Sequence, residues 1–249
     1  MKKRQKLFIM TIAIIVSIFT MYQLFHNEKI SYIALGDSLA EGRNPYGEIG
    51  YGYTDFIADN LKENNKLKFY TKKYTKSGYK VQDVMDGLNN DSELKRDLRE
   101  AGLVTISVGA NDFLARINKN NLNINEIANY KNIVADIMPN IDICIKEVRK
   151  YAKKDLVIVG YYNPIPFLFN TSQKDLDLLF SYIDDEYNKI AKKYDAIYVS
   201  NYQLFKSNKD YLPNPLDIHP DIEGYQAIAN HVLDIVNNKK EWNSKVYMI

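Results

Sequence analysis

The sequence has few of the features that mark several classes of protein. Cys144 is its only cysteine, which excludes an intrachain disulfide and a zinc site built on cysteines. It has no glycine-rich phosphate loop, and no histidine–carboxylate cluster has metal-ligand spacing, so we expect neither a cofactor nor a metal. A net charge of only +2 lacks the excess of basic residues that nucleic-acid-binding proteins carry, so we expect no nucleic-acid partner. With 46% hydrophobic and 26% charged residues, the composition is that of an ordinary globular protein.

The N-terminal segment, residues 1–29, has the pattern of an export or anchoring signal. Basic residues within positions 2–6 precede an uncharged, largely apolar run at residues 7–25. As a helix, this run would be about 28 Å long, which is enough to span a bilayer. The basic flank is expected to stay in the cytoplasm and to leave the rest of the chain outside. We therefore predict a membrane-embedded signal anchor; the alternative is a cleaved signal peptide and a secreted protein.

The remainder, residues 30–249, alternates between strand-like and helix-like segments. Short β-rich apolar runs occur at 30–36, 68–74, 103–109, 156–160 and 196–200. Amphipathic helical patterns lie between or after them, at 51–65, 124–153 (with a bend expected near Pro139), 175–194 and 221–237. This alternation predicts one α/β domain in which helices cover both faces of a parallel sheet. In such a sheet, functional residues gather at the carboxyl ends of the strands.

Two of the helical segments carry their apolar residues on a single stripe. The stripe of segment 175–194 consists of Leu178, Leu179, Ile183, Tyr187 and Ile190. The stripe of the last segment consists of Tyr225, Ile228, Ala229, Val232 and Val236. Apolar residues at this period predict helices that pack one face against the rest of the protein.

Polar residues follow three of the predicted strands, in the blocks Gly36-Asp37-Ser38-Leu39, Ser77-Gly78 and Gly109-Ala110-Asn111-Asp112. An exposed serine can act as a nucleophile, and an asparagine amide can donate hydrogen bonds into a site. Each block also has a simpler interpretation. Asp37 or Ser38 can cap the next helix, Gly78 can form a turn, and Asn111 can cap a helix that begins near Asp112.

His219 is the only histidine that the patterns place in a loop beside a carboxylate. It belongs to Asp217-Ile218-His219-Pro220, whereas His26 ends the apolar run and His231 lies inside the last predicted helix. An imidazole with a pKa near neutrality can act as the general base for a serine when a partner fixes its tautomer. His219 is therefore the candidate base, and a polar loop residue is the simpler alternative.

In chain order, the blocks GDSL, SG, GAND and DIHP resemble those of the GDSL, or SGNH, hydrolases, a family of serine esterases and lipases. The resemblance covers about residues 30–236. It implies a flavodoxin-like three-layer α/β/α sandwich with a five-stranded parallel sheet. It also implies that Ser38 is the nucleophile and that His219 is the general base and then the general acid. The oxyanion hole would be formed by the N–H groups of Ser38 and Gly78 and by the side-chain amide of Asn111.

The last block departs from the family pattern at the third catalytic residue. The family's aspartate usually stands three residues before the histidine, but Leu216 occupies that position here and Asp217 stands two residues before His219. A modest turn would bring the Asp217 carboxylate to Nδ1 of His219. The alternative is that a backbone carbonyl orients the ring and Asp217 faces solvent. We favour Asp217, because a carboxylate also stabilises the imidazolium that forms during catalysis.

The resemblance implies an enzyme that hydrolyses acyl esters of lipids or small molecules through an acyl-enzyme intermediate, and the N-terminal segment predicts that it is extracytoplasmic. Two alternatives are an O-deacetylase of cell-wall carbohydrate, for which 20 tyrosines and 10 phenylalanines offer stacking surfaces, and a catalytically decayed, membrane-anchored binding module. The apolar loop at 161–169 is a candidate wall of an acyl pocket or a membrane contact, with simple packing over the core as the alternative. The G-x-S-x-G elbow of α/β-hydrolases is excluded, because that nucleophile follows several earlier strands.

Overall fold

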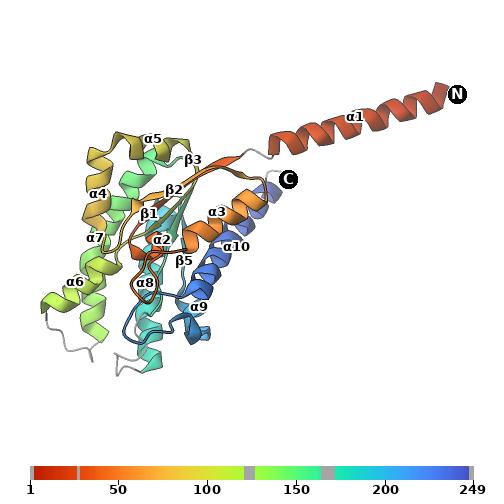
Figure 1. Cartoon of the computed structure of the whole chain (residues 1–249). Helices are drawn as coiled ribbons and strands as arrows, with labels where there is room; N and C mark the ends of the chain where they lie inside the picture. Colours follow the sequence, from red (N-terminus) through yellow and green to blue (C-terminus); the bar gives the residue numbers. More distant parts are fainter. Residues whose placement is uncertain (1–2, 27–28, 121–126, 164–171, 247–249) are drawn as a thin grey trace.

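The computed structural model describes residues 3–26, 29–120, 127–163 and 172–246, and a five-stranded sheet forms the middle layer of its body (Figure 1). The strands are β1 (Ile30–Gly36), β2 (Leu67–Thr75), β3 (Ala101–Ser107), β4 (Asp155–Val159) and β5 (Ile197–Val199). They are parallel and follow the order β2-β1-β3-β4-β5. This is the flavodoxin-like order, so the predicted sheet and its five strands are confirmed.

One face of the sheet is covered by α4 (Val81–Asn90), α5 (Ser92–Glu100), α7 (Ile127–Tyr151) and α8 (Gln173–Lys193). Their apolar side chains pack on buried strand residues such as Ile33, Ile106 and Ile158. Pro139 lies inside α7, which continues as one helix to Tyr151. The stripe predicted on α8 is correct except for Leu178, which is 48% exposed because it points away from this core.

The opposite face is covered by α3 (Tyr53–Glu63), α9 (Tyr202–Ser207) and α10 (Ile222–Val246). They pack on strand residues that point to this side, among them Tyr32, Ala34 and Val157. The whole stripe predicted on the last helix is buried here, which confirms that prediction; it consists of Tyr225, Ile228, Ala229, Val232 and Val236. The two helical layers and the sheet between them form the predicted three-layer sandwich.

Helix α1 (Lys3–His26) contains the apolar run at residues 7–25 and extends away from the body (Figure 1). The prediction of a membrane-spanning anchor is not supported. Among the residues that the structure describes, no helix has both the length and the apolar character needed to cross a membrane. The division of the chain into residues 1–29 and 30–249 stays a prediction.

The register of the sheet brings three strand ends to one edge. Gly36 at the end of β1 pairs with Thr75 at the end of β2 and with Ser107 at the end of β3. Because the three strands end at the same level, the segments that follow them emerge side by side. The short helix α2 (Ser38–Glu41) and helix α6 (Ala110–Asn120) both begin at this edge.

Candidate active site

Ser38 is held by a tight turn between β1 and α2. Gly36 has a φ of +127°, and a Cβ there would lie 2.1 Å from the Ser107 carbonyl oxygen, so only glycine fits. Asp37 caps α2, because its side chain accepts a hydrogen bond from the N–H of Leu39 at 3.0 Å. The capping interpretation is therefore correct for Asp37, and it leaves the half-buried Ser38 hydroxyl available for another partner.

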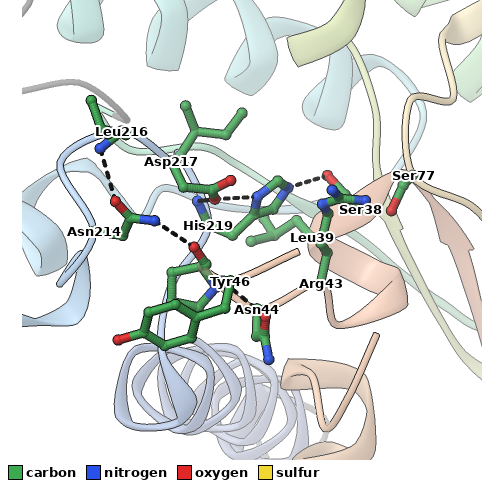
Figure 2. Close-up of polar contacts among 12 residues, drawn as sticks. Ser38, Leu39, Arg43, Asn44, Tyr46, Ser77, Asn214, Leu216, Asp217 and His219 are labelled. Carbon is green, nitrogen blue, oxygen red and sulfur yellow. Dashed lines mark hydrogen bonds and ion pairs between the residues drawn. The ribbon is translucent and has the colours of Figure 1, made fainter. Parts of the chain in front are cut away.

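That partner is His219, and the two residues join Asp217 in one chain of hydrogen bonds (Figure 2). Nε2 of His219 lies 2.8 Å from Oγ of Ser38. On the other side of the ring, Nδ1 lies 2.6 Å from Oδ1 of Asp217. The serine, the imidazole and the carboxylate thus have the geometry of a serine hydrolase triad, and a carboxylate rather than a backbone carbonyl faces Nδ1.

The loop before α10 is folded so that Leu216 turns away and Asp217 turns inward. Leu216 is 95% exposed, and its N–H donates to the side-chain oxygen of Asn214 at 3.0 Å. The other end of the Asn214 amide donates to the carbonyl of Pro45 at 2.7 Å, which ties the loop to the segment after α2. The hydroxyl of Tyr162 donates to the carbonyl of Ile218 at 2.9 Å. These contacts explain how an aspartate one position later than usual reaches the histidine.

Burial sets the charge of the imidazole. His219 is only 8% exposed, and this desolvation lowers its pKa below the usual 6.5. The Asp217 carboxylate opposes this lowering of the pKa, because it stabilises the imidazolium. The positive charge of Arg43 lowers the pKa further. The net lowering keeps the ring neutral at pH 7, which is the form that can accept a proton from a serine.

Gly78 and Asn111 lie at the ends of the neighbouring strands and are linked through Tyr79. Gly78 adopts a φ of +86°, and a side chain there would meet open space. The side-chain amide of Asn111 donates to the carbonyl oxygen of Tyr79 at 2.9 Å. Asn111 lines the same cavity as Ser38 and His219, whereas Gly78 belongs to the turn closed by the N–H of Tyr79 and the carbonyl of Lys76 and does not line that cavity.

An apolar cavity of about 130 Å³ opens beside the triad. Ser38, His219 and Asn111 lie in its wall, and the rest of the lining comes mainly from α6, α7 and α8. The apolar side chains that these helices contribute are Phe113, Leu114, Tyr130, Val134, Ile137, Met138, Leu176, Leu179, Phe180, Ile183 and Tyr187. A ligand that enters this cavity from the serine therefore meets hydrocarbon and aromatic surface rather than polar groups.

A sequence model of the GDSL-like Lipase/Acylhydrolase family matches residues 34–227. The chain belongs to this family. It is also 25% identical over 219 aligned residues to protein YpmR of Bacillus subtilis (strain 168), with 86% of this chain and 83% of that protein covered. The blocks that carry the resemblance thus lie within a match that extends over most of the body.

Two solved structures are similar in fold to this GDSL hydrolase. The lipase Lip_vut3 from a goat rumen metagenome has a TM-score of 0.64 at 19% identity, with 83% of this chain and 97% of that chain covered. The acetylxylan esterase Axe2 from Geobacillus stearothermophilus has a TM-score of 0.59 at 16% identity, with 84% and 94% covered. The family match establishes a GDSL-type ester hydrolase, and these likenesses establish its SGNH hydrolase fold.

A buried carboxylate lies directly behind the nucleophile of the hydrolase. Asp37 is 2% exposed and accepts hydrogen bonds from the hydroxyl of Tyr161 at 2.6 Å and from that of Ser107 at 3.0 Å. Burial raises the pKa of this carboxyl to about 6, against the opposing effect of these donors. Because Tyr161 also lines the cavity, the network connects the cavity wall to the turn that holds Ser38.

The sequence predicts only part of the cavity wall of the hydrolase. Tyr161, Tyr162 and Asn163 of the predicted acyl-pocket loop do line it, whereas residues 164–169 lie outside the described residues. The contribution of α6, α7 and α8 was missed, although the stripe that includes Leu179 and Ile183 was the available signal. Within the described ranges, no three histidine, cysteine, aspartate or glutamate side chains gather to hold a metal ion.

Proposed function

We propose that the protein hydrolyses carboxylic esters through an acyl-enzyme intermediate on Ser38 and that it acts outside the cytoplasm. The observation that carries the chemical proposal is the 2.8 Å contact between Ser38 Oγ and His219 Nε2, with Asp217 behind the imidazole. A serine becomes a strong nucleophile only when a base in hydrogen-bond contact removes its proton, and His219 is that base.

In the proposed mechanism, Ser38 Oγ attacks the ester carbonyl carbon while His219 takes the hydroxyl proton. The negative charge that develops on the carbonyl oxygen is stabilised by the N–H groups of Ser38 and Gly78 and by the second amide N–H of Asn111. His219 then protonates the departing alcohol. Water attacks the acyl-serine and gives its proton to His219. The second tetrahedral intermediate then collapses and releases the carboxylic acid, while His219 returns the proton to Ser38 Oγ.

The lining of the cavity supports a substrate whose acyl group is apolar and longer than acetyl. Side chains such as Val134, Ile137 and Leu179 surround the space next to Ser38, and burying acyl methylenes against them is favourable by about 0.8 kcal/mol each. An acetyl group would leave most of this surface unfilled. Deacetylation of cell-wall carbohydrate is thus the alternative function that the test must distinguish. The similarity to Axe2 shows a shared fold and does not bear on the substrate of this protein.

The test is a panel of esters of one alcohol with acyl chains from acetyl upward, together with an acetylated glycan. We expect kcat/KM to rise with chain length beyond acetyl, and the Ser38→Ala variant to lose activity on every ester. Ser92→Ala, an exposed serine at the start of α5, is the matched control and should behave as wild type. Exclusive activity on the acetylated glycan would contradict the proposed acyl specificity.

Covalent labelling tests the intermediate independently of the substrate. A fluorophosphonate should phosphonylate wild-type protein at Ser38, displacing fluoride, and should not label the Ser38→Ala variant. Mass spectrometry of a peptide that contains Ser38 measures this directly. Labelling at another residue, or turnover by Ser38→Ala at the wild-type rate, would overturn the assignment of the nucleophile.

The support for a location outside the cytoplasm is the charge pattern of residues 1–29, basic at positions 2–6 and uncharged over 7–25. N-terminal sequencing of the protein from separated cell fractions tests this proposal. A mature start between residues 20 and 32 would indicate a cleaved signal, and an intact Met1 in the membrane fraction would indicate an anchor. An intact chain confined to the cytosol would contradict both forms of the proposal.

A further inference from the structure

We propose that Glu41 is a positioning residue that holds the oxyanion hole in its active geometry, an inference that rests on the proposed acyl-enzyme mechanism. Glu41 is the last residue of α2, the short helix that begins with Ser38. Its Oε2 atom accepts two hydrogen bonds from Ser77, one from the N–H at 2.6 Å and one from the hydroxyl at 2.5 Å. Ser77 directly precedes Gly78 in the chain.

The backbone around Gly78 has to be held because its turn can exist in two forms. The N–H of Tyr79 donates to the carbonyl of Lys76 at 3.0 Å, and Gly78, the third residue, has a φ of +86°. This combination is typical of a type II turn. In a type I turn, the peptide between Ser77 and Gly78 is flipped, so the N–H of Gly78 would point to the opposite side. The oxyanion donor therefore depends on the turn type.

The ends of this turn have their own partners. The N–H of Lys76 donates to the carbonyl of Gly36 at 3.0 Å, and Asn111 donates to the carbonyl of Tyr79 at 2.9 Å. A Cβ placed on Gly78 would meet no atom within 4 Å, so side-chain packing does not restrain that residue. The contact of Glu41 with Ser77 acts on the middle of the turn, next to the peptide that carries the oxyanion donor.

A carboxylate suits this task because two donors converge on one oxygen, and hydrogen bonds to a charged acceptor are shorter and stronger than those between neutral groups. Glu41 is also joined to the nucleophile by a single helical turn. The N–H of Gly42, which follows Glu41, donates to the carbonyl of Ser38 at 3.0 Å. Helix α2 thus holds the nucleophile at its first residue and the donor loop at its last.

The first test compares Glu41→Ala with Glu41→Gln in the full-length protein, using one activated ester. Loss of the contact should lower kcat about tenfold to a hundredfold while KM changes less than about twofold, because the turn affects the transition state more than substrate binding. Glu41→Gln should recover most of this loss, since its amide oxygen still accepts from Ser77. Glu63→Ala, an exposed glutamate at the end of α3, is the matched control.

The second test measures coupling and transition-state affinity. Ser77→Ala should lower kcat less than Glu41→Ala does, and the double variant should be no worse than Glu41→Ala, because both changes remove one interaction. Affinity for an alkyl boronic acid, which forms a tetrahedral adduct with Ser38, should fall in parallel with kcat/KM. Additive losses, an equal loss in Glu41→Gln, or unchanged boronate affinity with reduced kcat would overturn the proposal.

Two controls keep these outcomes interpretable. If Glu41→Ala does not fold, Glu41→Gln and Ser77→Ala still test the proposal through the boronate series, because an unchanged affinity in Ser77→Ala would contradict it. The wild-type protein is first checked for activity that Ser38→Ala abolishes. Absence of that activity would refute the proposed mechanism itself, and a Ser38-dependent enzyme that is indifferent to Glu41 would refute only the positioning role.

Discussion

A single carboxylate oxygen of Asp217 contacts His219 twice: it accepts a hydrogen bond from the backbone N–H at 2.8 Å and lies 2.6 Å from the ring Nδ1. The first bond is an Asx-type turn, in which an aspartate side chain folds back onto the N–H two residues later. This turn places the carboxylate against the ring despite a spacing of two rather than three residues. The Asx-type turn thus closes the contact between Asp217 and His219 within a loop that the contacts of Asn214 and Tyr162 hold in place.

We expect Asp217→Asn to lower kcat by as much as about 10⁴-fold, because a neutral amide does not stabilise the imidazolium that forms during catalysis as a carboxylate does. The asparagine oxygen can still accept from the His219 backbone N–H, so the loop should keep its shape. The measurement is kcat for one activated ester, set beside that of His219→Ala. A near-wild-type Asp217→Asn enzyme would show that the protein uses a Ser38–His219 dyad.

Asn111→Ala should lower kcat about a hundredfold or more, which is the usual effect of losing one oxyanion donor. KM should change little, since the donor acts on charge that develops only in the transition state. The matched control is Asn132→Ala, an exposed asparagine on α7. Wild-type turnover by Asn111→Ala would remove this residue from the oxyanion hole and leave it only its contact with Tyr79.

The strands were predictable because parallel strands buried on both faces form nearly continuous apolar runs, as in β3 and β4. Helices α4 and α5 were not predicted. In α5, a nine-residue segment, only Leu94, Asp97 and Leu98 are buried, so the helical period has too few apolar positions to be recognised. The helix forms because Asp91 caps it and these leucines pack on the core.

The reacting groups were also predictable, because short blocks at strand ends carry them in a fixed order. The cavity was not, since an apolar stripe looks the same whether it faces packed core or an open space. Ile183 and Ile190 belong to one stripe on α8, yet Ile183 lines the cavity and Ile190 is buried in the core. The spacing of α6, α7 and α8 above the sheet decides which residues of the stripe line the cavity and which are buried in the core.

The pH dependence of kcat/KM should follow the imidazole of His219. Burial lowers its pKa below 6.5, and the ring acts as a base only when neutral, so activity should rise with pH to a plateau through a midpoint below 6.5. Asp37, whose pKa burial raises to about 6, titrates in the same range. NMR titration of the imidazole signal that His219→Ala removes separates the two groups. A His219 midpoint above 6.5 would contradict the desolvation argument.

The wall of the cavity should set the preferred acyl length, and Ile183 on α8 offers a direct test because it lines the cavity and is only half-buried. Ile183→Phe fills part of the space, so kcat/KM should fall about tenfold or more for long acyl chains and little for acetyl, in line with the energy of a few methylenes. Ile183→Ala should shift the optimum towards longer chains. Ile143→Ala, at a position on α7 that is 49% exposed, is the matched control and should keep the wild-type profile. If both Ile183 variants keep that profile as well, the acyl group binds elsewhere, and the apolar cavity is not the acyl site of this hydrolase.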